Sequence, residues 1–169
     1  YAVPGIIESW NLCNEDWINR PDSNQSYEDY KKWYWGLQKD FNPVKFDPEG
    51  WAKAGKDAGM KYLVFTTKHH DGFCMFDTKY SDYKITNEKT PFHTNVKKNI
   101  TKEIFNSFRK EGFWTGAYFS KPDWHSQFYW WDKFPPADRH CNYSIKKYPE
   151  QWKQFIQYTH NQIDELLSD

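Results

Sequence analysis

The sequence has no net charge, because 23 basic residues balance 23 acidic ones. Proteins that bind nucleic acid usually carry a strong basic excess, so this balance argues against a nucleic-acid partner. No run of about 18 apolar residues is present, so we expect no membrane-spanning helix. The first residues also lack a basic stretch followed by an apolar one, so any signal peptide is expected to be absent or already removed.

Cysteine is scarce as well. Cys13, Cys74 and Cys141 are odd in number and form no C-x-x-C pair. This pattern indicates neither a disulfide framework nor a zinc site. We expect no metal and no other cofactor.

Aromatic residues, in contrast, are abundant. They make up 21% of the chain, with 10 Trp and 12 Tyr. One interpretation is a core built from rings. The other is sugar binding, because flat apolar rings with polar edges suit the C–H faces of pyranoses. Composition alone leaves both interpretations open.

A long loop is expected over residues 1–26, followed by an aromatic, charged helix over Tyr27–Phe41. Local signals predict three further helices. The first begins at Asp47-Pro48-Glu49, with an N-cap followed by proline, and Gly59 is placed to end it. The second is capped by Asn99 and closed by Gly112. The third begins near Pro149 and is expected to bury one face, formed by Trp152, Phe155, Ile156, Thr159, Ile163 and Leu166.

Short apolar runs at Tyr62–Thr67 and Trp114–Phe119 predict two buried strands. Strands that alternate with helices are typical of βαβ units, so we expect the two strands to be parallel neighbours. Two strands alone cannot form a stable parallel sheet covered on both faces. The sequence therefore predicts an α/β fold that is part of a larger domain.

Polar and ionisable residues directly follow the first strand, in the segment from Thr66 to Phe73. In barrels and open α/β sheets, ligands bind at this end of the strands. A simpler interpretation is a polar junction in which Gly72 makes a turn. On a regular strand His69 and His70 would point to opposite faces, which argues against one shared metal ion.

A similar polar segment follows the second strand. It contains Tyr118, Ser120, Asp123, Trp124 and His125. Taken singly, a Trp-His pair usually reflects packing. Because the carboxyl ends of neighbouring parallel strands meet at one edge, the two segments together predict a shared pocket.

The stretch from Lys61 to Tyr83, with Lys-His-His-Asp-Gly-Phe at its centre, resembles the signature of α-L-fucosidases of glycoside hydrolase family 29. Further similarity in order and spacing covers nearly the whole chain. It includes Tyr1-Ala2-Val3-Pro4, Phe46-Asp47-Pro48 with Trp51, Ala58-Gly59, Phe108-Arg109-Lys110 with Gly112, and Tyr118-Phe119-Ser120 with Asp123-Trp124.

This resemblance implies a fold and a site. The fold would be a partial (β/α)8 TIM barrel, with residues 1–169 as an N-terminal fragment of the catalytic domain, roughly the first three β/α units without the first strand. The fucose pocket would be lined by His69, His70 and Tyr118. Glu8, next to Trp10, matches a glutamate that touches the sugar in the family, and Glu15 with Trp17 competes for that role. Trp124 and His125 would lie near the pocket wall.

Two departures from the family pattern concern catalysis. The family's first-strand His-Trp-Gly has no counterpart here, and Asp169 stands in the wrong context to be the fourth-strand nucleophile. The nucleophile and the acid/base are thus expected beyond this sequence. We therefore expect a fragment of an exo-acting retaining α-L-fucosidase (EC 3.2.1.51), inactive by itself and prone to self-association.

The implied partner is a fucosylated glycan or a small fucoside, and the implied location is secreted, periplasmic or lysosomal. Two other functions remain open on the sequence. One is a non-catalytic carbohydrate-binding module that uses the same aromatic residues. The other is a metal-dependent hydrolase that uses His69, His70 and Asp71.

Overall fold

A computed structural model of the chain describes residues 9–13, 15, 24–136 and 138–168. Helix α1 spans Tyr27–Gly36, α2 spans Pro48–Asp57, α3 spans Ile100–Lys110 and α4 spans Pro149–Ser168. Short 3-10 helices occur at Ser9–Leu12, Leu37–Lys39 and Pro91–Thr94. The first of these lies in the segment that was predicted to be loop.

The predicted helix starts are confirmed by their capping bonds. The Asp47 side chain accepts a hydrogen bond from the Gly50 N–H at 3.0 Å, and Asn99 accepts one from the Lys102 N–H at 3.3 Å. Gly59 and Gly112 follow their helices with φ of 76° and 87°. Such values favour glycine and allow the chain to turn sharply into each strand.

Helix α1 is shorter than predicted. It ends at Gly36, and the chain continues as a 3-10 turn over Leu37–Lys39. The Leu37 N–H donates to the Tyr34 carbonyl, three residues earlier, which is the tighter 3-10 pattern. The segment that was predicted to be helical to Phe41 is therefore an α-helix to Gly36, followed by one tighter 3-10 turn to Lys39.

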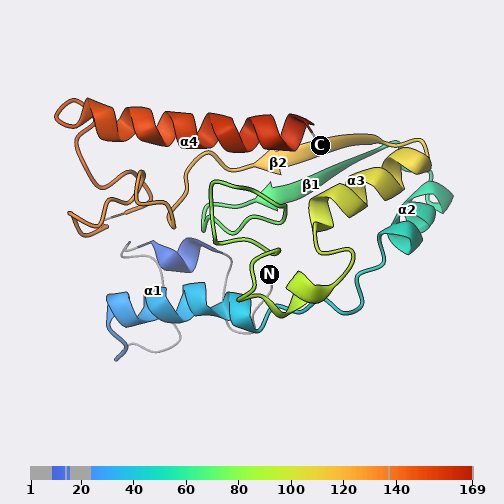
Figure 1. The fold of residues 1–169 in the computed structure, drawn as a ribbon, viewed down its shortest axis with the longest axis horizontal. Coiled ribbons are helices and arrows are strands. Elements are labelled where there is room, and N and C mark those ends of the chain that lie inside the picture. Colours follow the sequence, from blue (N-terminus) through green and yellow to red (C-terminus); the bar gives the residue numbers. More distant parts are fainter. Residues whose placement is uncertain (1–8, 14, 16–23, 137, 169) are drawn as a thin grey trace.

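Strands β1 (Tyr62–Lys68) and β2 (Trp114–Phe119) pair in parallel, as predicted. Tyr62 faces Trp114 and Thr66 faces Tyr118, and the register shifts between Thr66 and Lys68. Figure 1 shows the two strands side by side, with α2 and α3 next to them and α4 running along the β2 side. Leu63 and Phe65 pack against the apolar faces of α2 and α3. One face of the sheet is thus covered by this helix pair.

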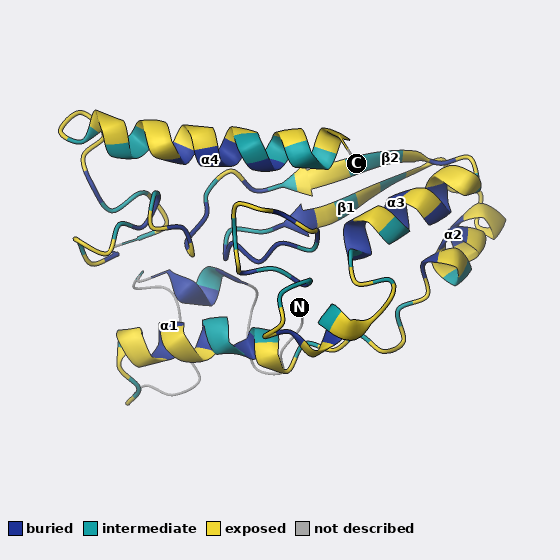
Figure 2. Ribbon diagram, viewed as in Figure 1, coloured by how far each residue is buried: buried dark blue, intermediate teal, exposed yellow. Residues whose placement is uncertain are grey.

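The opposite face of the sheet is open. Tyr62 and Trp114 are 67% and 82% exposed, and Val64 and Tyr118 are exposed too. Figure 2 shows exposed stretches on both strands beside the buried inner turns of α3. A two-stranded parallel sheet with helices on one face agrees with the expected α/β class, while closure into a barrel stays a prediction.

Helix α4 buries a different set of residues from the predicted one. Phe155 and Thr159 are buried as expected, but Ile156 is 40% exposed, so its assignment to the buried face was wrong. Tyr158 and Gln162 are buried instead. Their polar atoms bond to groups at the ends of the strands, so polar contacts set the orientation of α4. Among the described residues, no helix is long and apolar enough to cross a membrane.

Candidate functional site

The two histidines that follow β1 lie together. Their ring centroids are 4.4 Å apart, although neighbours on a regular strand point to opposite faces. Regular pairing fails just before them, at the register shift between Thr66 and Lys68, and β1 ends at Lys68. The alternation of a regular strand therefore does not hold at this strand end, and the two imidazoles lie together.

His69 contacts two hydroxyl-bearing residues. The Ser9 Oγ lies 2.5 Å from its Nδ1, and the Tyr118 ring stacks at 6.1 Å with an interplanar angle of 20°. The Ser120 hydroxyl donates to the Tyr118 hydroxyl at 3.5 Å. Tyr118 comes from β2, so side chains from both strand ends meet as predicted. Each of these groups can donate to or accept from a sugar hydroxyl.

His70 lies against two indoles. The Trp10 ring meets it edge-on at 5.2 Å, and the Trp124 ring lies 5.3 Å away. Trp10 and Trp124 also contact each other at 5.6 Å. The backbone N–H of Trp124 donates to the His70 carbonyl at 2.8 Å, which fixes the loop after β2 against the end of β1. Histidines and tryptophans from three segments of the chain thus form one cluster.

A buried ion pair lies beneath this cluster. The Lys68 ammonium is 3.0 Å from the Asp123 carboxylate, and both side chains are fully buried. Lys68 also donates to the Gln162 amide oxygen at 3.0 Å, and Asp123 accepts from the Tyr158 hydroxyl at 2.8 Å. Burial alone would raise the pKa of the Asp123 carboxyl, but the charges of Lys68 and His125 and the hydrogen bonds from Lys68 and Tyr158 together outweigh it and lower that pKa. The carboxylate therefore stays ionised.

The other Asp123 oxygen shapes the loop that carries Trp124 and His125. It accepts from the His125 and Ser126 N–H groups at 3.1 and 3.0 Å. Gly72 lies so close that an added Cβ would stand 2.3 Å from the same oxygen, and its φ is 86°. The glycine of the Lys-His-His-Asp-Gly motif is thus required by close approach as well as by the turn.

Asp71, the remaining acid of the motif, is buried, and within the described residues no lysine or arginine forms an ion pair with it. Its carboxylate accepts from the Tyr34 hydroxyl at 3.1 Å and from the Phe73 N–H at 3.2 Å. Burial raises the pKa of Asp71, and these hydrogen bonds oppose the shift only in part. Asp71 therefore links α1 to the histidine loop. Among the described residues, no group of three His, Cys, Asp or Glu side chains is arranged to hold a metal ion.

Of the two candidate glutamates, Glu8 lies outside the described residues. Both carboxylate oxygens of Glu15 accept from the Arg139 side chain at 2.9 Å, and the Arg139 N–H adds a further bond at 3.2 Å. It is Trp10, two residues after Glu8, that contacts His70. Glu15 thus forms an ion pair with Arg139, and the choice between Glu8 and Glu15 for the sugar contact stays a prediction.

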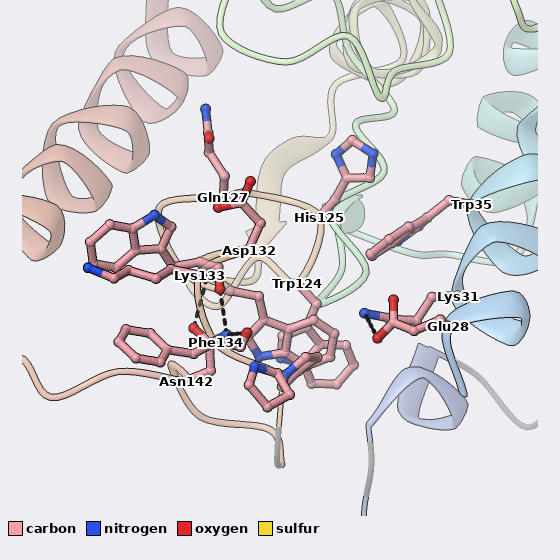
Figure 3. A pocket seen from close by; sticks show the side chains of 14 residues that line it. Glu28, Lys31, Trp35, Trp124, His125, Gln127, Asp132, Lys133, Phe134 and Asn142 are labelled. Carbon is pink, nitrogen blue, oxygen red and sulfur yellow. Dashed lines mark hydrogen bonds and ion pairs between the residues drawn. The ribbon is translucent and has the colours of Figure 1, made fainter. Parts of the chain in front are cut away.

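The last predicted residue, His125, contacts rings other than those around His70. Its ring stacks on Tyr83 at 4.4 Å and meets Trp35 edge-on at 5.2 Å. Trp124 and His125 line a hollow between α1 and residues 124–142, whereas His69, His70 and Tyr118 do not. Figure 3 shows Trp35, Lys31 and Glu28 of α1 on one side of this hollow, facing the loop side chains. Of the five proposed residues that the structure describes, His69, His70 and Tyr118 lie in the histidine cluster, His125 lines this hollow, and Trp124 contacts both.

Several residues of the site were not predicted. Ser9 is a 3-10 residue in an expected loop, while Tyr158 and Gln162 come from a distant helix. The available sequence signal was Lys68, which directly follows the apolar run of the first strand. A lysine that is buried at such a position requires an acidic partner. Nothing in the sequence pointed to Ser9.

A family model matches the chain along its whole length, and known proteins resemble large parts of it. A family model described as "Alpha-L-fucosidase" matches residues 1–169. Alpha-L-fucosidase 1 of Arabidopsis thaliana is 32% identical over 99 residues, which are 56% of this chain and 19% of the relative. A putative α-L-fucosidase of Caenorhabditis elegans is 31% identical over 133 residues, which are 73% of this chain and 26% of the relative.

Solved structures of α-L-fucosidases also resemble the chain. A GH29 α-L-fucosidase from Bacteroides thetaiotaomicron has a TM-score of 0.67 and 32% identity, over 89% of this chain and 32% of that one. Isoenzyme 1 from Paenibacillus thiaminolyticus has a TM-score of 0.62 and 41% identity, over 83% of this chain and 31% of that one. The chain thus spans about a fifth to a third of the four relatives named here. Because the family model covers all its residues, the chain belongs to the α-L-fucosidase family.

Proposed function

We propose that the chain is the fucose-binding part of an exo-acting, retaining α-L-fucosidase that hydrolyses terminal α-L-fucosyl bonds. The observation that carries this proposal is the histidine cluster: His69 and His70 lie together at the carboxyl ends of two parallel strands, beside Tyr118 and Trp10. The relatives named above are α-L-fucosidases, which favours a hydrolase over a non-catalytic binding module.

In this proposal the cluster binds and orients the sugar. His69, His70 and Tyr118 exchange hydrogen bonds with its hydroxyls, and Glu8 accepts from another hydroxyl. The Trp124 indole packs against His70, and His125 follows Trp124 in the same loop. Such groups supply orientation and hydrogen bonds that strengthen as positive charge develops on the ring.

The proposed reaction retains the anomeric configuration. One carboxylate attacks the anomeric carbon, while a second protonates the leaving oxygen and then activates water. The Bacteroides thetaiotaomicron enzyme has been trapped as a covalent intermediate with 2-fluoro-fucosyl fluoride, which supports this course. Asp71 and Asp123 are buried and hydrogen-bonded, so neither is suited to attack a sugar. We therefore place the nucleophile and the acid/base outside the printed sequence.

The open face of the sheet supports a barrel. We propose that residues 1–169 form an N-terminal part of a (β/α)8 catalytic domain, in which Tyr62, Val64 and Trp114 point into the barrel. Such interiors are filled by side chains from neighbouring strands. A secreted, periplasmic or lysosomal location goes with this proposal, and imaging a tagged protein would test it.

A hydrolysis assay tests the proposed activity. The protein expressed from the full reading frame should release 4-nitrophenol from its α-L-fucoside but not from the α-D-galactoside or β-D-glucoside. The printed 169 residues alone should release none above background. A full-length protein without fucoside hydrolysis would refute the proposed function. Sustained turnover by the 169 residues, free of host fucosidase, would refute the placement of the two carboxylates.

A further inference from the structure

Ser9 carries a buried hydroxyl that the proposed sugar contacts do not use. It begins the 3-10 helix Ser9–Leu12 and is only 5% exposed. Its Oγ lies 2.5 Å from the Nδ1 of His69, 60 residues away in the chain. Buried hydroxyl groups in proteins are hydrogen-bonded, and this contact satisfies that requirement for Ser9.

The 3-10 helix contacts both histidines of the cluster. Trp10, the residue after Ser9, places its ring edge-on to His70 at 5.2 Å. Leu12 is fully buried, and its carbonyl accepts a hydrogen bond from the Tyr27 hydroxyl of α1 at 2.5 Å. Two consecutive residues of an anchored turn therefore contact two consecutive histidines, as expected of a segment that positions them.

The surroundings of the His69 ring leave one nitrogen for a ligand. The Tyr118 ring stacks on it at 6.1 Å, and the His70 ring lies 4.4 Å away. Nδ1 faces Ser9, so Nε2, on the other side of Cε1, is the polar atom that remains. His69 is half-buried, so part of its ring is open to solvent.

The distance between Ser9 and His69 indicates which group donates. A neutral imidazole carries a hydrogen on one nitrogen, and the other nitrogen accepts. Bonds from N–H donors span about 2.7–3.2 Å, whereas O–H donors approach to about 2.5 Å. The separation of 2.5 Å therefore fits a hydroxyl that donates to Nδ1. In that arrangement the ring hydrogen lies on Nε2.

We infer that Ser9 is a positioning residue, whose hydroxyl holds His69 in the Nε2–H tautomer so that His69 donates a hydrogen bond to a hydroxyl oxygen of the sugar. The inference rests on the proposed function for the identity of that sugar. It makes His69 a donor, whereas the residue type alone allows either role. Without the Ser9 hydroxyl the ring is free to take both tautomers, and only a fraction of the protein presents the donor.

NMR spectra of the protein from the full reading frame, labelled with ¹⁵N-histidine, test the tautomer directly. Ring nitrogens with and without a hydrogen resonate far apart, and the His69 signals are those that His69→Ala removes. At about pH 8, where an ordinary imidazole is neutral, Nε2 should carry the hydrogen and Nδ1 should not. Ser9→Ala should give a mixture of the two tautomers. L-Fucose should shift the Nε2 signal of the parent protein.

Kinetics test whether the tautomer matters to the reaction. Ser9→Ala should lower kcat/KM for an aryl α-L-fucoside about twofold to tenfold, the effect of one neutral hydrogen bond. Ser9→Thr keeps a hydroxyl and should recover most of this loss. Ser9→Cys adds no methyl group and carries a weaker donor, so it should lie between the parent and Ser9→Ala. Ser107→Ala, which removes a buried hydroxyl from α3, should leave kcat/KM unchanged.

The outcomes separate this inference from the proposed function. A hydrogen on Nδ1 in the parent protein would overturn the inference. So would a Ser9→Ala protein in which only the Tm falls, while the tautomer and kcat/KM stay as in the parent. A protein that keeps the Nε2–H tautomer but neither binds L-fucose nor hydrolyses fucosides would refute the fucose site and leave the tautomer assignment standing.

Discussion

The two ends of the strand pair differ in an unexpected way. At the amino ends, the large apolar side chains of Tyr62 and Trp114 are exposed. At the carboxyl ends, Thr67, Lys68 and Asp123 are fully buried. Hydrophobicity alone would predict the reverse, because lysine and aspartate are rarely buried unless they are paired.

This difference separates two kinds of constraint. The carboxyl end is fixed by directional contacts, since the Lys68–Asp123 pair bonds to α4, to the loop after β2 and to the backbone beside His125. The amino end carries an exposed apolar surface, and apolar contacts are not directional, so this surface can pack against many other apolar surfaces. We therefore expect changes at the carboxyl end to damage the site, and changes on the open face to alter mainly association.

The strongest test of this comparison is to break the buried ion pair. Lys68→Met leaves the Asp123 carboxylate buried without its cation and should lower the free energy of unfolding by about 3–5 kcal/mol. Urea denaturation measures this loss. Lys121→Met, at an exposed lysine near the same strand end, should cost little. The double change Lys68→Met with Asp123→Leu should recover much of the loss, because no charge is then buried. A Lys68→Met protein as stable as the parent would contradict this account.

Acid should distinguish the two buried aspartates. The folded-state pKa of Asp123 is lowered, so its stabilising contribution is present above the unfolded pKa and is lost as pH falls through the folded pKa. The pKa of Asp71 is raised, so its ionisation opposes folding at neutral pH and this penalty is relieved as pH falls.

Asn substitutions at these positions should therefore differ in sign. At neutral pH, Asp123→Asn should lower the free energy of unfolding, whereas Asp71→Asn should leave it unchanged or raise it. The Asn oxygen keeps an acceptor for the Phe73 N–H, its NH2 group can donate to the Tyr34 hydroxyl oxygen, and no buried charge remains. Unfolding free energies measured from about pH 3 to pH 7 show whether each substitution raises or lowers stability. Equal losses in the two variants would show that ionisation is not the difference between them.

The open face should govern association rather than stability. We propose that the 169-residue chain self-associates, because exposed strand faces and apolar patches find partners in other copies. Val64→Lys with Trp114→Lys should reduce the mass seen by light scattering and change the free energy of unfolding by only about 0.5 kcal/mol. Val96→Lys, at an exposed position outside the sheet, controls for the added charge. A chain that is monomeric at high concentration without these changes would refute the proposal.

Local signals in the sequence predicted much of the fold. Asp47, Asn99, Gly59 and Gly112 mark helix ends through contacts with their own neighbours, and the two apolar runs mark the strands. The buried face of α4 could not be predicted in this way. It is set by Tyr158 and Gln162, whose partners lie 35 and 94 residues away in the chain.

The same limit applies to the site. The meeting of the two strand ends followed from parallel order, so His69 and Tyr118 could be placed together. The side-by-side histidines depend on a register shift that no local pattern revealed. The hollow is built by α1 and residues 124–142, and the loop portion has no periodic pattern from which its shape could be inferred.

Histidine substitutions in the protein from the full reading frame test the central claim, that the carboxyl-end cluster binds fucose. His69→Ala and His70→Ala should each lower kcat/KM for an aryl α-L-fucoside at least about tenfold, since a lost hydrogen bond costs about 1–3 kcal/mol. Tyr118→Phe should cost less, because the ring remains. His160→Ala, at an exposed position on α4, should change nothing. The account predicts these losses with an unchanged Tm. A lower Tm with kcat/KM near the parent value would contradict it.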